Sequence, residues 1–168
     1  LMERNSALLA DVPGLGKTIQ TFAACEGDGQ TLLRILVITP AGLKYNWGNE
    51  YTKWYRGTVN IITGSSKQRA YFWQLDNKFT IVSYDIVAVD YHLIKDIVWD
   101  VIVCDEATWL KNPLAKRTKI VKSLKANKRI ALTGTPFSNS PIDVWSIVDW
   151  LAPGYLGSFS TFKNNHVI

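Results

Sequence analysis

The chain has 168 residues and a formal net charge of +5, and its 47% hydrophobic and 20% charged residues are typical of a globular protein. A chain of this length is expected to form one domain that is stable without disulfides or structural metal. Its longest apolar runs have four or five residues, so neither a membrane-spanning helix nor a signal peptide is expected.

Cysteine usage and charge distribution bear on location and partners. Cys25 and Cys104 lie far apart and match no metal spacing, which favours buried thiols and an intracellular location in the cytoplasm, nucleoid or nucleus.

Residues 107–142 hold eight basic and no acidic residues, whereas the rest of the chain holds 11 basic and 14 acidic ones. This basic block would either face a nucleic acid or form the solvated side of a helix, and the second interpretation is favoured.

Short apolar runs rich in β-branched residues alternate with longer amphipathic stretches along the chain. We expect strands at residues 6–10, 35–39, 59–63, 80–83, 101–104 and 130–133. The runs are continuous rather than alternating with polar residues, as expected of a sheet covered on both faces. The succession of strand, helix and strand predicts an α/β fold with a mainly parallel sheet.

Three helices are indicated by apolar spacing and by end signals. The first has apolar residues at i, i+4, i+8 and i+11, namely Leu43, Trp47, Tyr51 and Trp54. A second apolar stripe, with lysines on the opposite side, consists of Leu114, Ile120, Val121 and Leu124. The third helix is expected to begin at Pro141 and to end near Leu151. We expect the tryptophans to pack in the core, with Trp109 as the exception.

A glycine-containing loop at residues 11–18 follows the first expected strand and opens a helix. Glycines let backbone N–H groups approach phosphate oxygens, and the start of a helix adds further donors. Lys17 would reach the β- and γ-phosphates of ATP, and the Thr18 hydroxyl would bind Mg²⁺. We therefore predict an ATP site that consists of Gly14, Leu15, Gly16, Lys17, Thr18 and Ile19.

The loop departs from the general phosphate-loop pattern at one position, because Asp11 stands where the first glycine belongs. A plain glycine turn is one alternative, but Gly-Lys-Thr between a strand and a helix favours phosphate binding. A dinucleotide site is disfavoured, because Ile19 occupies the position of the third glycine.

An acidic pair, Asp105 and Glu106, ends the apolar run at residues 101–104. In a parallel sheet the carboxyl ends of the strands lie at one edge, so this pair is expected near the glycine loop. Asp105 could hold Mg²⁺ and Glu106 could polarise the attacking water. Such a pair often only faces solvent, and its combination with Gly-Lys-Thr favours the catalytic interpretation.

These motifs resemble those of Swi/Snf-type ATPases, a branch of the superfamily-two helicase-related proteins, in which Asp is usual at position 11. Further segments resemble family motifs and occur in the family's order. They are residues 38–43 together with Asn46, Trp47 and Glu50; residues 82–85; residues 105–112; residues 132–136 together with Asn139; residues 143–147; and residues 153–158. The resemblance extends over residues 6–162, which is nearly the whole chain.

The resemblance implies a P-loop NTPase with a RecA-like three-layer sandwich that works as an ATP-dependent translocase, or helicase, on double-stranded DNA. Residues 1–168 would be the N-terminal lobe of a longer protein, with a second lobe completing the ATP cleft. Catalysis is implied for Lys17, Asp105 and Glu106, with Mg²⁺ held by Thr18 and Asp105. DNA phosphate contacts are implied for Thr39, Pro40, Ser83 and Tyr84. Coupling between nucleotide and lobe movement is implied for Thr108, Thr133, Gly134, Thr135 and Pro136.

The sequence departs from the family pattern at three places. Thr108 replaces a His that ends the acidic box, Val12-Pro13 replaces Glu-Met, and Ser138 replaces Gln. One alternative is therefore a nucleotide-responsive nucleic-acid-binding module with little turnover. A second is an RNA-directed helicase of the same superfamily, which the context of Asn46-Trp47 and of residues 110–112 disfavours.

Overall fold

The computed structural model describes residues 6–12, 14–26, 33–135 and 140–166. Within them a six-stranded sheet has the order β1-β6-β5-β2-β4-β3, and every pair of neighbouring strands is parallel. The strands are β1 (Ser6–Leu9), β2 (Ile35–Thr39), β3 (Asn60–Ile61), β4 (Phe79–Ser83), β5 (Val98–Cys104) and β6 (Lys125–Leu132). The predicted α/β fold with a parallel sheet is confirmed.

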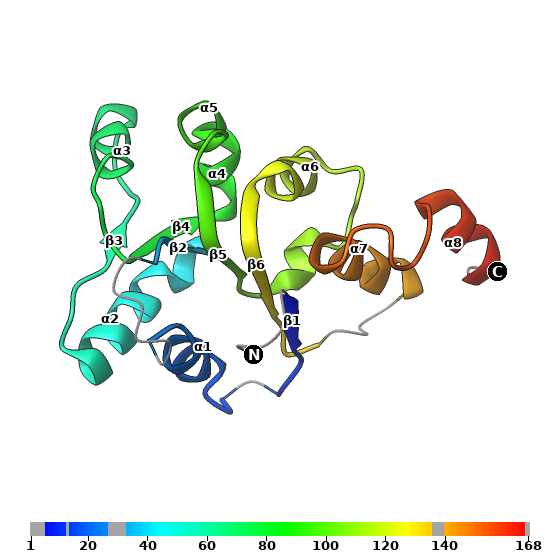
Figure 1. The fold of residues 1–168 in the computed structure, drawn as a ribbon, viewed down its shortest axis with the longest axis horizontal. Helices are drawn as coiled ribbons and strands as arrows, with labels where there is room; N and C mark the ends of the chain where they lie inside the picture. Colours follow the sequence, from blue (N-terminus) through cyan, green and yellow to red (C-terminus); the bar gives the residue numbers. More distant parts are fainter. Residues whose placement is uncertain (1–5, 13, 27–32, 136–139, 167–168) are drawn as a thin grey trace.

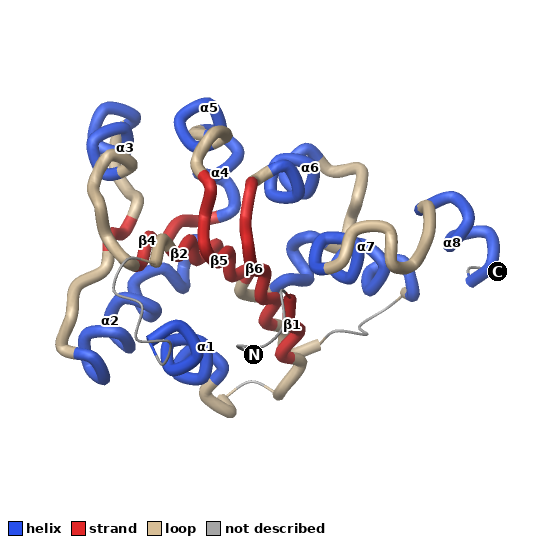
Figure 2. The backbone as a smooth tube through the Cα atoms, viewed as in Figure 1, coloured by secondary structure: helices blue, strands red, loops and turns tan. Residues whose placement is uncertain are grey.

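Helices cover both faces of the sheet and give the molecule three layers (Figures 1 and 2). One face carries α1 (Lys17–Glu26) and α2 (Lys44–Tyr55). The other carries α4 (Tyr84–Val89), α5 (Tyr91–Ile94), α6 (Lys116–Ser123) and α7 (Pro141–Leu151). The remaining helical segments are α3 (Ser66–Phe72), α8 (Phe159–His166) and two 3₁₀ turns, η1 (Ala41–Leu43) and η2 (Ala107–Leu110).

The central strands are mostly apolar because successive side chains enter different layers. In β2 all five residues are buried. Leu36 and Ile38 belong to the cluster beneath α4 to α7, whereas Ile35 and Val37 belong to the cluster beneath α1 and α2. This packing fixes the sheet and brings the carboxyl ends of its strands to one edge.

Strand β6 begins at Lys125, five residues before its predicted start, and β5 begins at Val98 rather than residue 101. The early part of β6 alternates between exposed and partly buried residues, so it lacks the apolar run that the prediction required. Cys25 and Cys104 are buried thiols without a disulfide, as expected. In the described part of the chain, no helix has the length and apolar character needed to cross a membrane.

Two predictions about apolar stripes were wrong. Leu114 lies before α6 and is 67% exposed, so it does not belong to the buried side of that helix. Trp54 lies on α2 but is 56% exposed, whereas Trp47 and Tyr51 of the same helix are buried. The spacing predicted the helix correctly, but helix α2 buries a narrower face than its aromatic residues suggest.

Candidate nucleotide-binding site

The loop between β1 and α1 has the backbone shape of a phosphate cradle. Gly14 and Gly16 have φ angles of +89° and +74°, a left-handed conformation that favours glycine. The Lys17 ammonium donates to the carbonyl oxygens of Asp11 at 2.7 Å and Val12 at 3.2 Å, so the loop curls around this side chain. The loop therefore presents a cation and the first N–H groups of α1 at one point.

The acidic pair meets this loop, as the sequence predicted. A pocket of about 490 Å³ is lined by Gly14, Gly16, Lys17, Thr18, Ile19, Leu43, Glu50, Trp54, Asp105 and Glu106. All the residues predicted to bind ATP line it except Leu15, which is 59% exposed. A pocket of this size suits a small-molecule ligand. The wall that α2 contributes through Glu50 and Trp54 was not predicted to be part of the site.

Asp105 is held by donors from several elements. Its Oδ2 atom accepts hydrogen bonds from the Thr39 hydroxyl at 2.9 Å and from the Trp47 indole Nε1 at 2.8 Å. Its Oδ1 atom accepts from the backbone N–H of Glu106 at 3.0 Å, and its carbonyl oxygen accepts from the Tyr84 hydroxyl at 2.8 Å. The carboxylate therefore has one defined orientation at the end of β5.

Glu106 has two unusual features for a surface carboxylate. Its φ of +48° places a residue with a side chain in the left-handed region, which carries a cost of about 1 kcal/mol or more. Partial burial raises the pKa of Glu106, the neighbouring Asp105 charge raises it further, and the Lys17 charge opposes both. A carboxylate with a raised pKa is better suited to accept a proton.

The donor set of this pocket fits a magnesium ion. The Thr18 hydroxyl and the Asp105 and Glu106 carboxylates are hard oxygen donors that line one cavity. Within the described ranges no cluster of three or more His, Cys, Asp and Glu residues forms an all-protein metal cage. Mg²⁺ characteristically takes one or two carboxylates and completes its shell with phosphate oxygens and water, which is what this pocket offers.

The residues predicted to contact DNA are mostly covered by protein. Thr39, Ser83 and Tyr84 are buried, and the hydroxyls of Thr39 and Tyr84 bind Asp105 instead. Pro40, which follows Thr39, is partly exposed. Thr39 and Tyr84 have no exposed surface and Ser83 is 3% exposed, so of these four residues Pro40 offers the most surface to DNA in this structure.

Those residues predicted to couple nucleotide to movement that the structure describes do not line the pocket. Thr108 is in η2, directly after the acidic pair, and is partly buried. Thr133 is buried, donates its backbone N–H to Leu9 of β1 at 3.0 Å and accepts at Oγ1 from the N–H of Thr135. Gly134 and Thr135 lie closer to the surface, and Pro136 lies outside the described residues.

Comparison with known proteins decides the family. The model of the SNF2-related domain matches residues 1–168. The chain belongs to the SNF2-related family. The resemblance seen in the motifs, and the RecA-like interpretation of the sheet, are therefore confirmed.

Relatives and solved structures agree with this assignment. Human DNA repair and recombination protein RAD54B is 34% identical over 171 residues, covering 95% of this chain and 19% of that protein. An uncharacterized ATP-dependent helicase of Mycoplasma genitalium, MG018, is 36% identical, covering 94% and 16%. The Sulfolobus solfataricus SWI2/SNF2 ATPase core in complex with dsDNA superposes with a TM-score of 0.83 at 39% identity, covering 94% of this chain and 33% of that one. This SNF2-related chain thus spans less than a fifth of the two curated relatives.

Proposed function

We propose that this SNF2-related lobe binds ATP with Mg²⁺ and hydrolyses it as part of a motor that moves on double-stranded DNA. The observation that carries the proposal is that Lys17 and Thr18, at the start of α1, line the same pocket as Asp105 and Glu106, which follow β5. The solved relative with a TM-score of 0.83 is bound to dsDNA, which supports DNA as the partner.

Four of the pocket residues have a proposed role in the attack of water on the γ-phosphate. The Lys17 ammonium and the N–H groups at the start of α1 bind phosphate oxygens and offset the charge that develops on them. Thr18 and Asp105 hold Mg²⁺, which when bound neutralises charge on the β- and γ-phosphates. Glu106 orients the water and accepts its proton while the bond from the γ-phosphorus to the bridging oxygen breaks.

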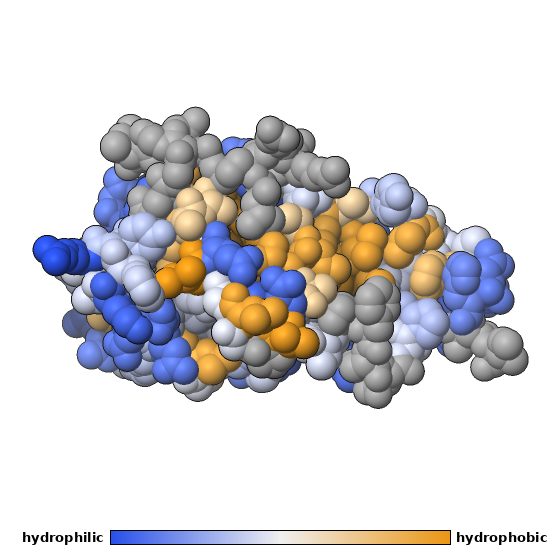
Figure 3. Space-filling view, turned by 90° about the horizontal axis from the view of Figure 1, so that it is seen from below, coloured by the Kyte–Doolittle hydropathy of each residue, from blue (hydrophilic) through white to orange (hydrophobic). Residues whose placement is uncertain are grey.

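We also propose that residues 1–168 form one lobe and that a second lobe completes the cleft. The edge that carries the loop is seen in Figure 3, where apolar side chains gather across the middle of the face. The loop residues Val12 and Leu15 are 60% and 59% exposed. Exposed apolar surface beside a catalytic pocket is typical of an interface, and a second lobe of an intracellular motor is the partner that the family resemblance implies.

Phosphate release by the intact protein tests this function. We expect strong stimulation by duplex DNA and little stimulation by single-stranded RNA. Equal or greater stimulation by RNA would support the RNA-directed alternative. Nucleotide binding without stimulated turnover would support the binding-module alternative, which Thr108 in place of His makes worth testing.

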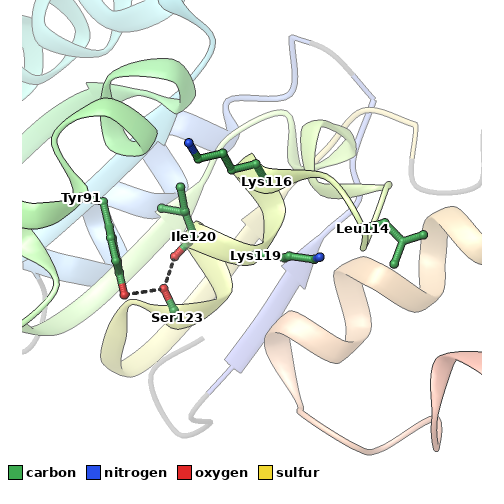
Figure 4. Close-up of a pocket in the computed structure, with 6 residues that line it drawn as sticks. All are labelled: Tyr91, Leu114, Lys116, Lys119, Ile120 and Ser123. Carbon is green, nitrogen blue, oxygen red and sulfur yellow. Dashed lines mark hydrogen bonds between the residues drawn. The ribbon is translucent and has the colours of Figure 1, made fainter.

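The structure divides the basic block into paired and unpaired residues. Lys122 binds Asp149 at 2.7 Å and lies over the Trp145 ring, and Arg117 binds Asp85 at 2.6 Å. Lys116 and Lys119 have no ion-pair partner among the described residues and line a shallow hollow of about 530 Å³ with Tyr91 and Ser123 (Figure 4). The charge available to a nucleic acid is therefore smaller than the sequence indicates.

We expect Lys116→Ala to lower the salt dependence of DNA binding, reducing the slope of log K against log salt by about 1. The ion pair between Arg117 and Asp85 brings the start of α6 beside Ser83–Tyr84, the segment that the family resemblance assigns to DNA contact. Lys122→Ala is the matched control, and it should leave the slope unchanged because Lys122 is already paired. Equal slopes for Lys116→Ala and wild type would show that this side of α6 is only solvated surface.

A further inference from the structure

Two buried side chains converge on one oxygen of the metal-binding carboxylate. Thr39 is fully buried at the end of β2, and Trp47 is 2% exposed on α2. Both donate to Asp105 Oδ2, at 2.9 Å and 2.8 Å. Residues 39, 47 and 105 are far apart in sequence, so this arrangement exists only in the folded lobe.

Core packing by itself does not require these hydrogen bonds. The indole Nε1 atoms of Trp99 and Trp150 are buried in the same small domain without a hydrogen-bond partner. The Thr118 hydroxyl is likewise buried without a partner. This core therefore accommodates buried indoles and a buried threonine that serve packing alone, whereas Trp47 and Thr39 both bind the same carboxylate.

The consequence concerns the orientation of Asp105. A free carboxylate rotates among several orientations and loses that freedom when it binds a cation. Two donors on Oδ2 and the Glu106 N–H on Oδ1 hold both oxygens in place before any ligand arrives. Hydrogen-bond partners of metal-binding groups typically contribute to metal affinity in this way.

We propose that Thr39 and Trp47 are positioning residues that hold Asp105 in its metal-binding orientation. The inference rests on the proposed function, since it takes Asp105 as a Mg²⁺ ligand. It also assigns a role to Thr39 other than contact with DNA, and it gives Trp47 a role beyond core packing. Neither side chain lines the pocket, so both act through Asp105.

The test measures the affinity of the intact protein for a fluorescent ATP analogue, once with excess Mg²⁺ and once with EDTA. Trp47→Phe and Thr39→Val each remove one donor while keeping a similar shape. We expect each to weaken nucleotide binding about tenfold in Mg²⁺ and to leave the affinity in EDTA unchanged. Thr39→Ser keeps the hydroxyl and should restore the wild-type affinity.

Trp150→Phe and Thr118→Val are the matched controls, because they remove a buried indole N–H and a buried hydroxyl that have no partner. They should bind nucleotide as wild type does under both conditions. Equal losses in the controls and in the Trp47 and Thr39 variants, or losses that persist in EDTA, would overturn the proposal. A wild-type protein that gains no affinity from Mg²⁺ would contradict the proposed Mg²⁺ site itself. A wild-type gain that the Trp47 and Thr39 variants retain in full would contradict only the positioning roles.

Discussion

Replacing Lys17 by alanine, or Glu106 by glutamine, will reduce DNA-stimulated ATP hydrolysis by the intact protein at least about 100-fold. Lys17→Ala removes the cation at the phosphate cradle and the donor that holds the carbonyl oxygens of Asp11 and Val12, so the loop loses its shape as well as its charge. Glu106→Gln keeps the size of the side chain but removes the group that accepts the proton from water.

The two variants should fail at different steps. Lys17→Ala should weaken nucleotide binding, whereas Glu106→Gln should still bind ATP and duplex DNA. Measuring equilibrium binding and phosphate release for each variant separates these two effects. Lys53→Ala is a suitable control, because Lys53 is an exposed residue of α2 that does not line the pocket. Turnover like that of wild type in either Lys17→Ala or Glu106→Gln would contradict the assigned chemistry.

Replacing Asp90 by alanine will lower the free energy of unfolding by about 3–5 kcal/mol, the usual cost of breaking a buried ion pair. Asp90 is 3% exposed and accepts hydrogen bonds from Arg69 Nε at 2.7 Å and Nη2 at 2.9 Å, and from Trp73 Nε1 at 3.0 Å. The variant would leave the Arg69 guanidinium and the indole N–H without this acceptor. The pair joins α3 to the turn between α4 and α5, so its loss should loosen the packing between these helices.

Urea unfolding measured at neutral pH tests this value. Asp76→Ala is the matched control, because its pair with Arg34 is 3.4 Å long and the two side chains are 81% and 54% exposed. Exposed pairs contribute at most about 1 kcal/mol. Similar losses in the two variants would show that the Asp90 pair is not an unusually strong contact.

The Asp90 pair also predicts a pH dependence. Burial raises the pKa of Asp90, but hydrogen bonds from Arg69 and Trp73 and the Arg69 charge outweigh it, so the pKa lies below that of an ordinary Asp. The unfolded chain therefore takes up the proton at a higher pH than the folded one. The stabilisation is present at neutral pH and is lost as the pH falls below the ordinary Asp value towards the folded one. The difference between wild type and Asp90→Ala should shrink over that range.

Features carried by neighbouring residues were predictable from the sequence. The strand predicted at residues 35–39 is β2 with the same bounds, because a short, uninterrupted run of apolar, mostly β-branched residues favours a buried strand. The helix from Pro141 to Leu151 is α7, whose N-cap Ser140 accepts from the Ile142 N–H and whose first position suits proline. The glycine loop and the acidic pair were predictable for the same reason, and parallel strands bring them to one edge.

Features that depend on distant partners were decided by the tertiary structure alone. Nothing near Thr39 or Trp47 in the sequence shows that both donate to Asp105, and nothing near Lys122 shows its pairing with Asp149. Trp47 and Trp54 lie two helical turns apart and were expected on the same side of α2. Trp47 is buried whereas Trp54 lines the pocket, because burial depends on what packs against each turn of the helix. Motifs thus determine which chemistry is present, whereas long-range packing determines which side chains remain available to perform it.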